Sequence, residues 1–151
     1  MLRKVVPILL VIVWLMVIFN FSSDEGAVSQ SKSQVITDYI HQNYDEVAEK
    51  VDENLLHYLV RKSAHVTLYF VLCLVVMNAL YFGGFRGKGL FVRAFLICVF
   101  YASLDEIHQR FISNRTGKLT DVYIDSIGII LAIALSLTME RAYNYIRRRF
   151  D

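Results

Sequence analysis

The sequence is poor in the residues that hold small proteins together covalently or through metals, since its 151 residues include only two cysteines. Cys73 and Cys98 each lie in the middle of a long apolar stretch. We interpret both as small apolar side chains that fill the protein interior. The cysteine content therefore argues against a disulfide framework and against a cysteine metal pair.

The sequence also lacks the motifs by which common hydrolases are recognised. It contains no H-E-x-x-H, no G-x-S-x-G and no phosphatase-type P-S-G-H motif. No serine or cysteine stands where a nucleophile would be expected, because both cysteines fall in the middle of apolar stretches. These absences exclude the most familiar routes to hydrolysis without deciding whether the protein is an enzyme.

Charge is scarce in four long stretches, and 56% of all residues are apolar, which is typical of a membrane protein. The stretches are 15 to 19 residues long, whereas roughly 20 residues span a bilayer core. The shorter two must therefore draw flanking polar residues into the membrane. We predict transmembrane helices over residues 5–21, 64–82, 90–110 and 121–139. The first is predicted as an uncleaved helix rather than a signal peptide, because NFSSDEGA is a poor cleavage site.

The basic residues cluster where cytoplasmic segments are expected. Arg3 and Lys4 precede the first span, three bases surround the turn between spans two and three, and four arginines follow the fourth. Residues 22–63 instead hold eight acids and four bases. Lys and Arg are enriched on the cytoplasmic side, so both termini are predicted to be cytoplasmic. Anionic inner-leaflet lipid explains the basic side, and no nucleic acid is needed as a partner.

Between the first two spans, the sequence predicts a small polar linker followed by an amphipathic helix. Apolar residues recur near helical spacing over residues 34–59, and Ser33 is a candidate N-cap. This helix is expected to lie on the outer interface or to be an ordinary connector. The predicted fold is all-α: one domain over residues 1–151, an integral membrane bundle of four transmembrane helices plus an extracytoplasmic amphipathic helix.

Polar residues occur in stripes near the outer ends of the last three predicted spans. They recur at i, i+3 or i, i+4 spacing, which puts them on one helix face. Lipid cannot satisfy such groups, so a bundle is expected to bring the stripes together inside. The members are Arg61, His65 and Tyr69 in the second span; Tyr101, Asp105, His108 and Gln109 in the third; and Asp121 and Asp125 in the fourth.

The alternative is a set of buried ion pairs that only fix the helix register, such as Arg61 with Asp105 or Asp125. For three single residues, a simple interfacial or solvent-exposed position is the stronger interpretation. Glu106 would face headgroups, Arg110 would extend to the interface, and Lys118 would be a solvated loop charge.

At these residues the chain resembles the VanZ-like membrane protein family. The segments RKSAHVTLYFVL and YASLDEIHQRFISNRTGKLTDVYIDSIGIILA match its motifs, and FSSDEGAVSQSKS is similar to its F-S-S-x stretch. The resemblance implies a multi-pass protein of the bacterial cytoplasmic membrane, and the founding member is linked to low-level teicoplanin resistance. The motif positions are Arg61, Lys62, His65, Tyr69, Asp105, Glu106, His108, Gln109, Phe111, Arg115, Asp121, Asp125 and Gly128.

The first functional hypothesis is a pocket that binds an envelope lipid or a lipid-linked cell-wall precursor at the outer leaflet, and so affects teicoplanin susceptibility. Arginine suits phosphate, and carboxylates suit a sugar or peptide. The predicted ligand-binding residues are Arg61, His65, Tyr69, Asp105, His108, Gln109, Arg115, Asp121 and Asp125.

The second hypothesis is an intramembrane hydrolase or transferase that uses a divalent metal or acid–base chemistry. A third is a structural or interaction protein, and a proton-coupled transporter would need a homo-oligomer because four short helices leave little room for a pathway. The catalytic candidates are His65, Asp105, Glu106, His108 and Asp125, and the metal candidates are His65, Asp105, His108 and Asp125.

Overall fold

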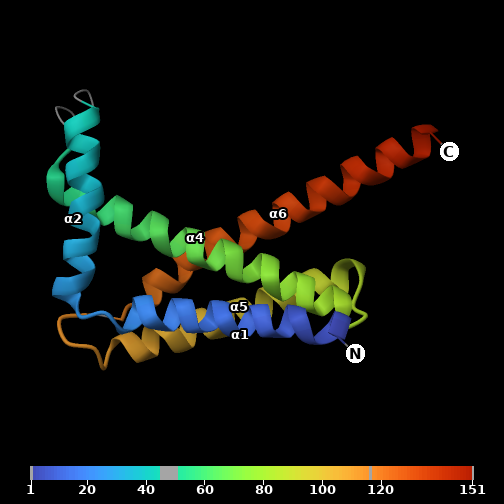
Figure 1. Cartoon of the computed structure of the whole chain (residues 1–151), viewed down its shortest axis with the longest axis horizontal. Coiled ribbons are helices and arrows are strands. Elements are labelled where there is room, and N and C mark those ends of the chain that lie inside the picture. Colours follow the sequence, from blue (N-terminus) through green and yellow to red (C-terminus); the bar gives the residue numbers. More distant parts are fainter. Residues whose placement is uncertain (1, 45–50, 116, 151) are drawn as a thin grey trace.

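The computed structural model describes residues 2–44, 51–115 and 117–150, with the side chains of residues 27 and 148–150 left aside. Within these residues the chain forms five α-helices (Figure 1). They are α1 (Leu2–Ser23), α2 (Gly26–Asn43), α4 (Glu53–Phe82), α5 (Gly87–Gln109) and α6 (Leu119–Phe150). The predicted all-α class is confirmed.

Helices α1, α4 and α5 run along the long axis, whereas α2 stands across the end of the bundle where α1 finishes (Figure 1). We call this the α2 end. The turn between α5 and α6 lies at the α2 end, and the N-terminus and the turn between α4 and α5 lie at the opposite end. Helix α6 crosses α4, and its last turns project away from the bundle toward the side of the N-terminus (Figure 1).

Three of the described helices are long and apolar enough to cross a membrane, namely α1, α4 and α6. They correspond to the first, second and fourth predicted spans. Helix α5 is not among these three, and it carries charged residues near both ends, Lys88 and Arg93 at one and Asp105 and Glu106 at the other. The fourth crossing therefore stays a prediction.

The segment between the first two spans differs from its prediction. Helix α2 begins at Gly26, inside the expected linker, and ends at Asn43. Ser33 is not an N-cap but an interior residue whose hydroxyl donates to the Gln30 carbonyl. Helix α4 begins at Glu53, where the Asp52 side chain accepts from the Leu55 amide at 3.1 Å. The predicted helix over 34–59 is thus replaced by two helices, and residues 45–50 lie outside the described residues.

The core fills the space between α1, α4, α5 and α6. Its buried members include Ile18, Leu72, Cys98 and Ile129, with Cys73 beside them. Both cysteines are buried thiols in this core, as expected for small apolar side chains that fill the interior. Two hydrogen bonds between residues far apart in the sequence connect α1 to its neighbours. Trp14 Nε1 donates to the Leu68 carbonyl of α4, and Tyr101 Oη of α5 donates to the Leu15 carbonyl.

Helices α4 and α6 approach most closely at Gly128. A Cβ added there would collide with the Val66 carbonyl oxygen and would lie 2.9 Å from the Phe70 amide nitrogen. Only glycine permits this backbone contact, and small residues are common where helices cross closely. The crossing sets α6 so that its first turn faces the polar stripe of α4.

Candidate functional site

A pocket of about 170 Å³ opens at the α2 end, between α4, the α5–α6 turn and the start of α6. The sequence predicted five of its lining residues as ligand-binding, and five more were not in that set. The predicted ones are Arg61, His65, Gln109, Arg115 and Asp121, and the others are Tyr58, Lys62, Asn114, Lys118 and Thr120.

The lining is strongly cationic. Four of its residues are lysine or arginine and only Asp121 is acidic. Lys62 forms an ion pair with Asp121, with Nζ 2.6 Å from Oδ1. Arg61 and the Lys118 ammonium have no hydrogen bond or ion pair with any described residue. Two of the four cations, Arg61 and Lys118, therefore have unpaired charges among the described residues. Of the other two, only Lys62 is paired with a carboxylate.

Arg115 anchors the wall of the pocket to α1. Its Nη2 donates to the Phe21 carbonyl in the last turn of α1 at 3.0 Å, and its Nε donates to the Asp24 carbonyl just after that helix at 2.9 Å. A cation at a helix C-terminus satisfies free carbonyls and the helix dipole. Burial lowers the pKa of Arg115, and the charge of Arg61 lowers it further; the guanidinium nevertheless remains protonated.

The α5–α6 turn folds back onto α5 and holds Lys118 at the pocket. The Lys118 amide donates to Glu106 Oε2 at 2.9 Å, and Arg110 Nε donates to the Gly117 carbonyl at 3.2 Å. A Cβ at Gly117 would collide with the Glu106 carbonyl oxygen. Lys118 is exposed, as predicted for a loop charge, but the turn places it in the pocket lining.

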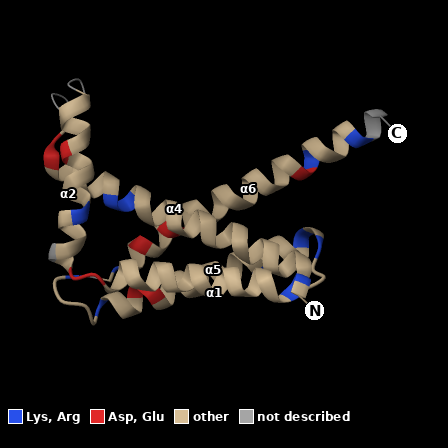
Figure 2. Ribbon diagram, in the orientation of Figure 1, with Lys and Arg blue, Asp and Glu red and all other residues tan. Residues whose placement is uncertain are grey.

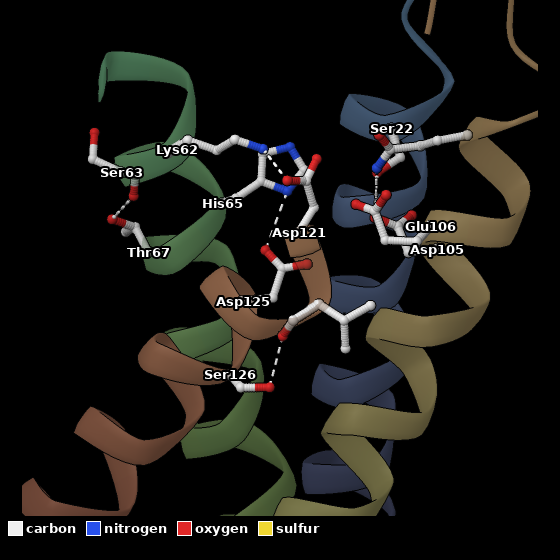
Figure 3. A network of polar contacts seen from close by, with 12 residues as sticks. Ser22, Lys62, Ser63, His65, Thr67, Asp105, Glu106, Asp121, Asp125 and Ser126 are labelled. Carbon is white, nitrogen blue, oxygen red and sulfur yellow. Dashed lines mark hydrogen bonds and ion pairs between the residues drawn. The ribbon is translucent and has the colours of Figure 1, made fainter. Parts of the chain in front are cut away.

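Three carboxylates lie in the bundle interior near this pocket. Asp125, Glu106 and Asp105 are 0%, 2% and 4% exposed. The Nδ1 atom of His65 lies 3.4 Å from Asp125 Oδ1, although neither Asp125 oxygen makes a hydrogen bond to the described chain. Figure 3 shows His65 on α4 and Asp125 on α6, with Asp105 and Glu106 facing them from α5. Glu106 is buried, so the expectation that it faces headgroups is wrong.

Asp105 belongs to a hydrogen-bond network that reaches α1. It accepts from Ser22 Oγ at 2.8 Å and from Gln109 Nε2 at 3.0 Å. The Oε1 atom of Gln109 in turn accepts from Arg115 Nη1 at 3.3 Å. Tyr69 is fully buried, and its hydroxyl has no hydrogen-bond partner among the described residues.

His108 faces α1 and not the other candidates. Its Nε2 atom lies 3.2 Å from Ser23 Oγ, and its ring stacks on Phe19 with centroids 4.8 Å apart. The residues that the structure describes contain no group of three histidine, cysteine or acidic side chains arranged to hold a metal. The structure therefore separates His108 from the pair formed by His65 and Asp125.

The expected ion pairs of Arg61 with Asp105 or Asp125 do not form between these described residues. Asp121 pairs with Lys62 and Asp125 with His65 instead. Arg61 and Lys62 stand four and three residues before His65, so spacing on α4 places both near its face. Which of the two pairs with Asp121 depends on how α6 packs against α4.

Several residues of the site were not predicted from the sequence, for different reasons. Ser22 was visible only as part of the F-S-S stretch, and its bond to Asp105 spans 83 positions of the chain. Asn114 and Thr120 reach the pocket through the path of the α5–α6 turn. No periodic pattern marks residues of a turn, because their directions depend on its folding.

Comparison with known proteins supports one assignment. The family model described as VanZ/LLP1 matches residues 7–140, which is 134 of the 151 residues (140 − 7 + 1). Neither a curated protein nor a solved structure matches the chain. The match includes every helix that supplies the pocket, and on this ground the chain belongs to the VanZ-like family.

Proposed function

We propose that the protein spans the bacterial cytoplasmic membrane and binds the anionic headgroup of an envelope lipid, or of a lipid-linked cell-wall precursor, at the outer leaflet. In this proposal α1, α4, α5 and α6 cross the membrane, and both termini are cytoplasmic. The α2 end then lies at the outer surface, and α2 rests on the interface.

The charge distribution supports this orientation. Lys and Arg gather at the N-terminus and at the turn between α4 and α5, and Asp and Glu gather toward α2 and the adjoining bundle (Figure 2). Lys/Arg excess favours the cytoplasmic side of a membrane protein. A cysteine-accessibility assay on intact cells tests the proposal, with single cysteines at Lys88 and Asn43 in a variant that lacks Cys73 and Cys98. Labelling of the cysteine at position 88 from outside the cell would show that the orientation is the reverse of the one proposed.

The observation that carries the proposal is the free Arg61 guanidinium in a pocket with four cationic side chains and one carboxylate. Guanidinium groups recognise phosphate by bidentate, charge-assisted hydrogen bonds. Uncompensated cations held together repel one another, and a bound anion would remove that repulsion. Ion pairing that served stability alone would have neutralised Arg61.

Lipid co-purification tests the proposal. Wild-type protein and Arg61→Ala are extracted in mild detergent, and the retained anionic lipid is measured by native mass spectrometry. Loss of a charged hydrogen bond is worth about 1.5–3 kcal/mol, so Arg61→Ala is expected to weaken binding by roughly 10- to 100-fold. Arg141→Ala is the control, because Arg141 is an exposed arginine of α6 outside the pocket lining. Equal, unselective lipid in all three proteins would contradict the proposal.

A second candidate function rests on the pair formed by His65 and Asp125. A histidine oriented by a buried carboxylate is a common arrangement for a general acid or base. His65 also lines the cationic pocket, where a phosphate ester would be held. A hydrolase or transferase that acts on such an ester predicts that His65→Gln abolishes turnover even at lipid concentrations that saturate the pocket. No turnover of phosphate-ester lipids by the wild-type protein would reject this candidate.

An effect on teicoplanin susceptibility follows from the binding proposal. A protein that binds or remodels an envelope lipid changes how a lipoglycopeptide meets the membrane surface. The minimum inhibitory concentration should therefore differ between cells that express wild-type protein and cells that express Arg61→Ala at equal level. Equal inhibitory concentrations would show that the pocket does not affect teicoplanin susceptibility.

A further inference from the structure

A second pocket, of about 130 Å³, adjoins the cationic one on the α1 and α2 side of α4. Its lining differs in character, since five of its residues have apolar side chains. They are Phe21, Ile36, Val60, Ala64 and Leu68. Three further residues line both pockets, namely Arg61, His65 and Arg115. The two pockets therefore meet at the free guanidinium.

The arrangement follows from the spacing on α4. Val60, Ala64 and Leu68 recur every four residues and so form one apolar stripe on the helix. Arg61 and His65 each follow a member of this stripe by one residue, which turns them about 100° away around the helix. One face of α4 is therefore apolar, and its edge carries the groups that bind an anion.

Helix α2 supplies the outer wall of the apolar pocket through Ser29, Lys32, Ser33 and Ile36. Lys32 is held in place by Asp24, with Nζ 2.5 Å from Oδ2. It also lies over the Phe21 ring, 5.1 Å from the centroid. Ile36 is the apolar member of this wall, and the other three residues are polar.

The volume of the cationic pocket limits the size of the headgroup. An apolar cavity of about 150 Å³ holds a benzene molecule, whereas drug-sized ligands need roughly 300–1,000 Å³. At 170 Å³ the cationic pocket accommodates a phosphate group with few further atoms. A disaccharide would have to remain outside it.

We propose that the ligand is a lipid whose headgroup is little more than a phosphate, and that the first carbons of one hydrocarbon chain lie in the pocket between α1, α2 and α4. This inference rests on the proposed function and adds the ligand class and the position of the chain. The phosphate sits between Arg61, Arg115 and Lys118. The chain leaves it along the stripe formed by Val60, Ala64 and Leu68.

Binding of simple alkyl phosphates to purified protein tests the inference. The probes are inorganic phosphate, methyl phosphate, hexadecyl phosphate and hexadecanol, measured by isothermal titration in one detergent. Wild-type protein is expected to bind hexadecyl phosphate more tightly than methyl phosphate, and to bind hexadecanol weakly. A lipid with a disaccharide pyrophosphate headgroup is expected to bind more weakly than hexadecyl phosphate, and equal binding would contradict the size limit.

Two tryptophan variants locate the chain. Ala64→Trp fills the apolar pocket and should weaken hexadecyl phosphate binding by fivefold or more, about 1 kcal/mol, while methyl phosphate binding is unchanged. Ala134→Trp is the matched control, since Ala134 is an exposed residue of α6 outside both pockets. Val60→Trp repeats the test if Ala64→Trp fails to fold.

The outcomes distinguish this inference from the proposed function. If Arg61→Ala loses every phosphate probe but Ala64→Trp and Val60→Trp bind hexadecyl phosphate like wild type, the chain lies elsewhere and only this inference fails. The same holds if wild-type protein binds methyl and hexadecyl phosphate equally. If no phosphate probe binds wild-type protein, the proposed function fails as well.

Discussion

The backbone contact between α4 and α6 at Gly128 gives the sharpest stability prediction. Gly128→Ala adds one methyl group where α6 meets α4, and its nearest neighbours are backbone atoms of Val66 and Phe70. Backbone atoms cannot move aside as a flexible side chain can. The two helices must separate, and the separation also lengthens the contact between His65 and Asp125.

The magnitude comes from two opposing effects. Overpacking at a rigid contact costs about 1–3 kcal/mol. Alanine is favoured over glycine inside a helix by about 0.8–1.0 kcal/mol, which offsets part of this cost. The expected net loss in the free energy of unfolding is therefore about 0–2 kcal/mol, and at 2–4 °C per kcal/mol it lowers the Tm by up to about 8 °C.

Thermal unfolding in detergent, followed by size-exclusion fluorescence, measures the change. Gly89→Ala on α5 is the matched control, because an added Cβ there meets only the end of the Arg93 side chain. The control should match or exceed the wild-type Tm. A Gly128→Ala protein as stable as Gly89→Ala would refute the close contact of α4 and α6.

Three further predictions concern the polar network. Ser22→Ala removes a hydroxyl bonded to Asp105 and leaves a buried carboxylate with one partner fewer, so a loss of about 1–3 kcal/mol is expected in the same assay. Arg115→Lys cannot contact both carbonyls at the end of α1 together with the Gln109 side chain, and its Tm should fall by several degrees, whereas an unchanged Tm would show that one contact suffices. A double-mutant cycle of Lys62→Met and Asp121→Asn should give a coupling of about 1 kcal/mol at low salt, and zero coupling would mean that the pair is not formed.

The buried polar groups bear on the choice between binding and a purely structural role. Both Asp125 oxygens, Glu106 Oε1 and the Tyr69 hydroxyl are buried without a hydrogen bond to the described chain. Leaving a buried polar group unpaired costs about 1–3 kcal/mol. A network kept only for stability would pair these groups, so their presence beside a cationic pocket favours a site that meets a ligand, a proton or water.

Periodicity alone predicted much of the architecture. The polar stripe of Arg61, His65 and Tyr69 on α4 and the pair of Asp121 and Asp125 on α6 follow from 3.6 residues per turn. The convergence of these faces at one end also followed, since apolar surroundings cannot satisfy them. The boundary between α2 and α4 was not predicted. A single N-cap residue such as Asp52 is a weak sequence signal when apolar residues continue at helical spacing on both sides of it.

The partners of each polar residue were beyond the reach of the sequence. His108 packs on Phe19 of α1, whereas His65 pairs with Asp125 of α6. The difference arises from the rotation of α5 about its axis, which the packing of whole helices sets. Spacing shows which residues share a face and leaves open which neighbour that face meets.

The sequence by itself determined the helical class, the apolar spans, the charge asymmetry and the set of polar residues at one end, because these depend on local composition and helix period. The tertiary structure decided which cations remain free, since Lys62 rather than Arg61 pairs with an acid across the crossing of α4 and α6. It also decided that the cationic pocket beside α4 adjoins a second pocket with apolar lining residues. Both depend on contacts between residues far apart in the chain, which are set only when the helices pack.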